Sequence, residues 1–121
     1  LPLYSEYKRI YVTEYVLHVY DCSNKSAEYA TLLREAGYDA DVMVVDDNRD
    51  SEYSHAIVRI KLKDGTLMYA DPTWNWYGPE LQQGLFILFE IPYEFMYNKF
   101  WFKDFIESGE LDFPGMEKYH K

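Results

Sequence analysis

The chain has few cysteines, few positive charges and no long apolar run, and each shortage excludes a class of protein. Its single cysteine, Cys22, cannot form an internal disulfide, so a disulfide-stapled scaffold is excluded. Lysine and arginine number 12 against 21 aspartates and glutamates. The resulting formal charge of −9 argues against a nucleic-acid partner. No apolar run reaches about 18 residues, so we expect no transmembrane segment.

What is present has the composition of a folded domain. Hydrophobic residues make up 48% of the 121 residues and charged residues 27%. This length can bury one sizeable core, so we expect a single domain over residues 1–121. Aromatic residues reach 19%, which predicts an aromatic-rich core or a surface built for contact. The start at Leu1 fits a processed product or a piece of a longer protein.

The clearest local pattern predicts a helix over residues 23–36. Small and apolar residues recur there at helical spacing, and Gly37 follows as a left-handed stop. Cys22 lies at the start of this helix, on the face that packs inward. Unpaired N–H groups and partial positive charge at a helix N-terminus favour a thiolate. Lys25 would add to this effect and Asp21 would oppose it.

Short strands are expected after the helix. Residues 40–46 are rich in valine, and a polar turn over residues 46–50 follows them. Residues 55–63 alternate, so that Ala56 and Val58 share one side of a strand while His55 and Ile57 share the other.

The turn after this strand decides whether His55 can meet Asp71, at the end of the returning strand 66–71. A two-residue turn would put the two side chains on opposite faces of the sheet. A three-residue turn over residues 63–65 puts them on one face, a diagonal step apart. Gly65 stands where the three-residue turn requires a left-handed residue, so we predict this register.

Two other regions have weaker patterns. Residues 7–20 fit either a strand or a modestly amphipathic helix. Residues 85–105 are dense in aromatic side chains and are split by Pro92, which favours a strand before it and a short helix after it.

Three residues together indicate thiol chemistry. A histidine within reach of Cys22 can take its proton and later protonate the leaving group, and an aspartate on the other ring nitrogen fixes the tautomer. Each residue alone has an ordinary explanation: Cys22 as a buried thiol, His55 as a strand histidine and Asp71 as a turn residue. Their joint occurrence argues for a triad. His18 is an alternative base. A metal site on the three residues lacks a fourth ligand, so we expect no metal or cofactor.

These segments resemble the transglutaminase-like superfamily. The resemblance covers under half the chain, from about Asp21 to Trp74. It is carried by residues 20–26, 32–38, 54–58 and 69–74, with the sequences YDCSNKS, LLREAGY, SHAIV and YADPTW. That family has a papain-like fold and a Cys-His-Asp triad in this chain order. The resemblance therefore implies that Cys22 is the nucleophile, His55 the base and Asp71 the orienting acid.

We accordingly predict an α+β, papain-like domain in which the Cys22 helix packs on a small antiparallel sheet. The expected function is acyl transfer or amide hydrolysis through a thioester on Cys22, with a protein or peptide substrate. Hydrolysis is favoured because no second-substrate site is visible. Trp74, Trp76 and Tyr77 would line the substrate cleft or else pack in the core. The alternative is a catalytically inactive interaction module that uses its aromatic C-terminal third.

Overall fold

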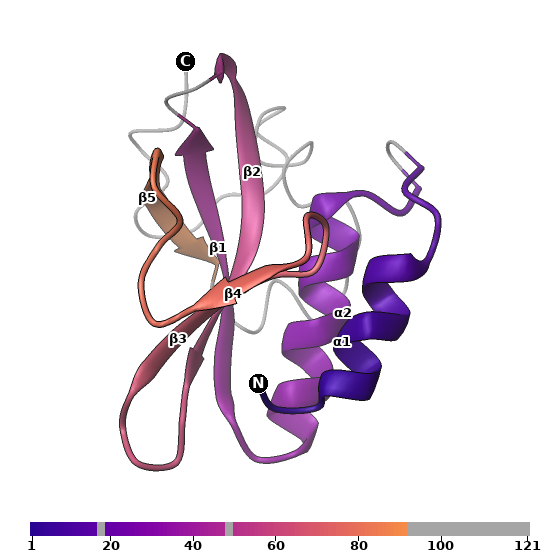
Figure 1. Cartoon of the computed structure of the whole chain (residues 1–121), viewed down its shortest axis with the longest axis vertical. Helices are drawn as coiled ribbons and strands as arrows, with labels where there is room; N and C mark the ends of the chain where they lie inside the picture. Colours follow the sequence, from indigo (N-terminus) through magenta and orange to yellow (C-terminus); the bar gives the residue numbers. More distant parts are fainter. Residues whose placement is uncertain (17–18, 48–49, 92–121) are drawn as a thin grey trace.

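The computed structural model describes residues 1–16, 19–47 and 50–91, which form an α+β arrangement of two helices and one antiparallel sheet (Figure 1). The helices are α1 (Tyr4–Val12) and α2 (Cys22–Glu35). The strands are β1 (Asp39–Asp47), β2 (Asp50–Lys61), β3 (Leu67–Asp71), β4 (Trp76–Gly78) and β5 (Leu85–Ile91). Their order across the sheet is β4-β3-β2-β1-β5. Within the described part of the chain, neither helix is long and apolar enough to cross a membrane.

Helix α2 confirms the predicted helix to within one residue at each end. Asp21 is its N-cap: the carboxylate accepts from the Ser23 N–H, and the Asn24 side chain accepts from the Asp21 N–H. Gly37 follows the helix with a φ of +92°, the left-handed conformation expected of a glycine stop. These caps place Cys22 in the first turn of α2.

Residues 7–20, which the sequence left open between strand and helix, contain most of α1. Helix α1 buries Tyr7 and Ile10 and packs beside α2 (Figure 1). After α1 the chain leaves helical geometry, and Val16 forms an isolated antiparallel bridge with Tyr20 just before the α2 N-cap.

The side chain of Lys25 fastens the end of α1. Its ammonium group donates to three backbone oxygens, those of Ile10 at 2.8 Å, Tyr11 at 3.0 Å and Thr13 at 2.6 Å. Carbonyl groups at a helix C-terminus lack partners within the helix, so this buried cation acts as a cap. Burial lowers the pKa of Lys25, and the charge of Glu28 offsets part of that shift. The ammonium group therefore stabilises the end of α1. Its closeness to Cys22 along the sequence did not predict this role.

The β2–β3 hairpin confirms the three-residue turn. The N–H of Leu62 donates to the oxygen of Thr66 at 2.8 Å, and Gly65 has a φ of +92°. The pairs of β2 with β3, from Val58 with Ala70 to Lys61 with Leu67, keep this register. If this register continues by one pair, Asp71 lies opposite Ile57. Its side chain is then on the same face of the hairpin as that of His55.

Apolar side chains form a core on each face of the sheet. The larger core lies between the helices and the sheet, and β2 contributes Ala56, Val58 and Ile60 to it, as the alternation predicts. The smaller core lies on the other face and consists of Met43, Val45, Ile57 and Leu85. Strand β5 ends just before Pro92, which confirms the predicted strand; the expected helix after Pro92, together with His18, lies outside the described residues.

Candidate active site

The central contact of the candidate site joins two buried side chains on neighbouring strands. His55 Nε2 lies 2.7 Å from Asp71 Oδ2, and the exposed fractions of these side chains are 1% and 0%. A carboxylate at this distance accepts from Nε2–H, so the neutral imidazole carries its proton on Nε2 and its lone pair on Nδ1. The predicted pairing of histidine and aspartate is therefore formed.

The other carboxylate oxygen of Asp71 organises the turn that follows it. Oδ1 accepts from the backbone N–H of Thr73 at 2.9 Å and of Trp74 at 3.1 Å. Together with His55, three donors therefore hold this carboxylate. Hydrogen bonds on both oxygens fix its rotation, which in turn fixes the plane of the imidazole.

Cys22 lies close enough to His55 to influence the charge of the imidazole. Burial opposes protonation of His55, but the hydrogen bond and charge of Asp71 and the influence of Cys22 outweigh it and raise the pKa of His55 to about 9. Nδ1 is buried and is outside hydrogen-bond geometry with any described residue. The ring thus has Asp71 on one nitrogen and the thiol as its other ionisable neighbour.

Helix α2 is anchored to β2 one turn after the cysteine. The Ser26 hydroxyl donates to the backbone oxygen of Ala56 at 3.0 Å, next to His55. Because residues four apart share a helix face, this bond lies on the face of α2 that also carries Cys22. The Cys22 side chain is only 1% exposed.

An indole covers one face of the imidazole. The rings of Trp74 and His55 stack with centroids 4.2 Å apart and planes 9° from parallel. Trp74 is 45% exposed, so it stands between the buried histidine and solvent. An imidazolium ion is also stabilised by the electron-rich face of an indole.

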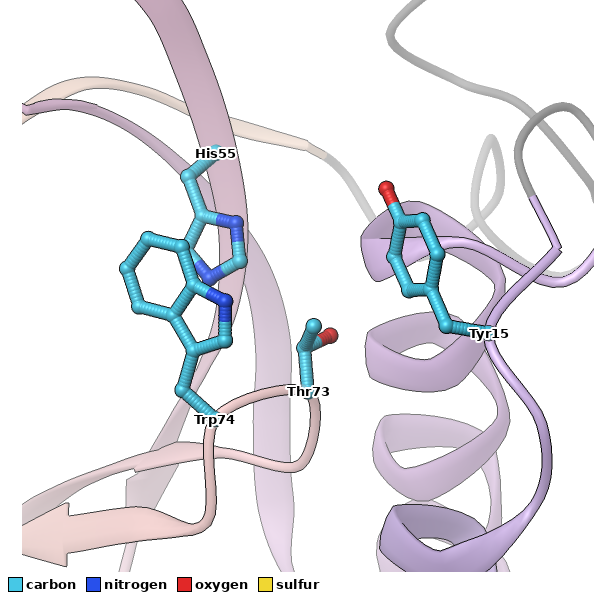
Figure 2. Close-up of a pocket in the computed structure, with 4 residues that line it drawn as sticks. All are labelled: Tyr15, His55, Thr73 and Trp74. Carbon is cyan, nitrogen blue, oxygen red and sulfur yellow. The ribbon is translucent and has the colours of Figure 1, made fainter. Parts of the chain in front are cut away.

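A pocket of about 360 Å³ opens beside these rings. It is lined by Tyr15, His55, Thr73 and Trp74, and Figure 2 shows Tyr15 across from the stacked pair with Thr73 at the base. The Thr73 hydroxyl is buried and makes no hydrogen bond to the described residues. Sequence reasoning did not select Tyr15 or Thr73. The position of Thr73 between Asp71 and Trp74 could have indicated that it lines the site. Nothing in the sequence around Tyr15 indicates this.

The other two predicted substrate-binding residues lie away from this pocket. Trp76 pairs with Asp71 across the β3–β4 ladder, and neither Trp76 nor Tyr77 is among the residues that line the pocket. The ring of Tyr77 instead packs edge-on against Tyr4 and Tyr7 of α1, with centroids 6.4 and 5.8 Å away.

No group of three or more histidine, cysteine, aspartate or glutamate side chains in the described ranges is arranged to hold a metal ion. Comparison of the chain with protein-family models, with curated proteins and with solved structures gave no match.

Proposed function

We propose that this protein carries out thiol-dependent acyl transfer or amide hydrolysis, with Cys22 as nucleophile, His55 as acid and base, and Asp71 as orienting group. The carrying observation is the 2.7 Å contact of His55 Nε2 with Asp71 Oδ2, which leaves Nδ1 for proton exchange with the thiol. We further propose that the fold is the papain-like arrangement of the transglutaminase-like superfamily, which the sequence resembles over the same residues.

The first half of the reaction forms a thioester. His55 Nδ1 takes the Cys22 proton, and the thiolate attacks the carbonyl carbon of an amide. The resulting tetrahedral species expels the amine as the C–N bond breaks, and imidazolium Nδ1–H supplies the proton that the amine needs. The acyl group is then bound to Sγ, and His55 is neutral.

The second half releases the acyl group. His55 removes a proton from water or from an amine, and that nucleophile attacks the thioester carbonyl. The C–S bond breaks, the thiolate regains its proton from the imidazolium, and the product is a carboxylic acid or a new amide. Asp71 remains ionised throughout and stabilises the imidazolium.

The pocket beside His55 has room for the leaving amine and for the incoming nucleophile, which both exchange a proton with the imidazole. Because His55 serves both the leaving amine and the incoming nucleophile, both would pass through the space between Tyr15 and Trp74. The net charge of −9 favours neutral or basic protein and peptide substrates by steering their approach.

One observation favours a second candidate, an inactive module that keeps the fold. Cys22 is almost fully buried and does not line the pocket, so a substrate reaches the sulfur only after side chains around it move. Buried cysteines without such motion behave as small apolar residues.

Thiol reactivity separates the two candidates. The native protein would be treated with iodoacetamide between about pH 5 and pH 9, and modification of its one cysteine followed by mass. For the enzyme we expect alkylation that persists below about pH 7 and is abolished by His55→Ala. His18→Ala is the matched control, since His18 is the other candidate base in the sequence. A thiol that reacts only after denaturation would support the module.

A further inference from the structure

We propose that Tyr7 is a positioning residue for the Cys22–His55–Asp71 site: its hydroxyl, presented by α1, holds the backbone of Asp71 so that the carboxylate faces the imidazole. This proposal rests on the proposed function and adds a residue that touches neither substrate nor the reacting atoms.

The Tyr7 hydroxyl lies between the two ends of the turn that joins β3 to β4. It is 3.2 Å from the backbone oxygen of Asp71 and 3.3 Å from that of Trp76. These two residues also form a pair in the β3–β4 ladder. A single donor shared by both oxygens ties the start of the turn to its end and ties both to α1.

The turn held in this way carries the parts that orient the imidazole. Between its ends lie Thr73 and Trp74, whose N–H groups hold Asp71 Oδ1, and Trp74 also covers His55. Asn75 has a φ of 56°, an uncommon left-handed conformation that the surrounding contacts must maintain. Loosening the turn would therefore disturb both the carboxylate and the indole.

Burial strengthens the role of this hydroxyl. The Tyr7 side chain is 0% exposed, so its polar group must find partners inside the protein. Burial and the charge of Asp71 raise the pKa of Tyr7, so the phenol stays protonated and able to donate throughout the range in which His55 titrates. A phenylalanine would fill the same volume and leave both carbonyl oxygens without this donor.

A neighbouring tyrosine supplies a matched control. Tyr29 is also 0% exposed, and its ring meets that of Tyr7 at a centroid distance of 5.4 Å. Its hydroxyl donates to the backbone oxygen of Pro2 at 2.7 Å, outside the turn that joins β3 to β4. Tyr7→Phe and Tyr29→Phe therefore each remove one buried hydroxyl from the same core, but only the first touches the Asp71 turn.

The experiment compares both variants with the parent protein by two readouts, iodoacetamide alkylation across pH and the pKa of His55 from NMR of its ring protons. In Tyr7→Phe we expect alkylation at about pH 6 to slow by roughly three- to tenfold, and the His55 pKa to fall from about 9 toward its ordinary value. Tyr29→Phe should lower stability to a similar degree and leave both readouts unchanged.

The two readouts test the role of Tyr7 independently of the proposed function. If the parent thiol reacts below neutral pH and Tyr7→Phe behaves like the parent, Tyr7 is only a core residue and the function stands. If the parent thiol is unreactive, the proposed function is wrong, and the His55 pKa still decides on Tyr7. An unchanged value in Tyr7→Phe, or an equal fall in Tyr29→Phe, overturns the proposal.

Discussion

The carboxylate of Asp71 binds the backbone N–H of Trp74, and the indole of Trp74 lies parallel to the imidazole that the same carboxylate orients. One side chain therefore sets both the direction of His55 and the position of its cover. Asp71 closes this turn locally, by accepting hydrogen bonds from the backbone N–H groups of Thr73 and Trp74. The proposed base is consequently shielded on one side and aligned on another by a single local structure.

Replacing the carboxylate should restore ordinary titration of the histidine. Among the groups that raise the pKa of His55, Asp71 acts first through its hydrogen bond and again through its charge. In Asp71→Asn we expect the pKa to fall from about 9 toward 6.5 or below, since burial then opposes the charge with less compensation. NMR titration of the His55 ring measures it. Asp64→Asn, in the exposed β2–β3 turn, is the control; a value near 9 in Asp71→Asn would contradict the assignment.

The same shift makes stability depend on pH in a defined window. His55 has a higher pKa in the folded protein than the ordinary 6.5, so its protonation favours the folded state. This contribution is complete below about pH 6.5 and is lost as the pH rises through about 9. Urea unfolding at about pH 6 and about pH 9.5 should show the parent losing on the order of 3 kcal/mol more than His55→Gln. Equal losses in both proteins would show that another group is responsible.

Local sequence signals predicted the parts of the site that depend on short-range geometry. The helical spacing of small and apolar residues and the Gly37 stop predicted α2, and Gly65 predicted the turn that fixes the β2–β3 register. Because side chains alternate along a strand, that register was enough to place His55 and Asp71 on one face. These inferences needed no knowledge of the rest of the fold.

Contacts between distant segments could not be predicted in this way. Tyr7 and Asp71 are 64 residues apart, and nothing near Tyr7 in the sequence indicates a partner in the β3–β4 turn. Lys25 was interpreted from its proximity to Cys22 along the chain, but its ammonium group extends to the end of α1. Helix α1 itself was ambiguous because tyrosine, isoleucine and valine, which also favour strands, supply its apolar positions.

Removing the indole should open the thiol to reagents. Trp74 is the exposed ring that lies directly on His55, so Trp74→Ala should increase the rate of Cys22 alkylation at about pH 8 by roughly threefold or more. Phe86→Ala is the matched control: Phe86 is 40% exposed and aromatic, but does not line the pocket. If both variants react at the parent rate, reagents reach the sulfur by a route that Trp74 does not cover.

The turn glycine should be the most sensitive position for the register. Gly65 has a φ of +92° with no atom within 4 Å of an added Cβ, so any cost of substitution comes from backbone conformation and not from a clash. Gly65→Ala should lower the free energy of unfolding by about 1–2 kcal/mol, and Gly65→Asn should cost less because asparagine tolerates the left-handed region. Chemical denaturation gives both values. The variants should also rank in the same order in alkylation below neutral pH, because a hairpin that slips by one residue moves Asp71 to the face opposite His55. Equal stabilities for Gly65→Ala and Gly65→Asn would show that the turn does not need its left-handed residue, and the register would then have to be specified by packing on the two faces of the sheet.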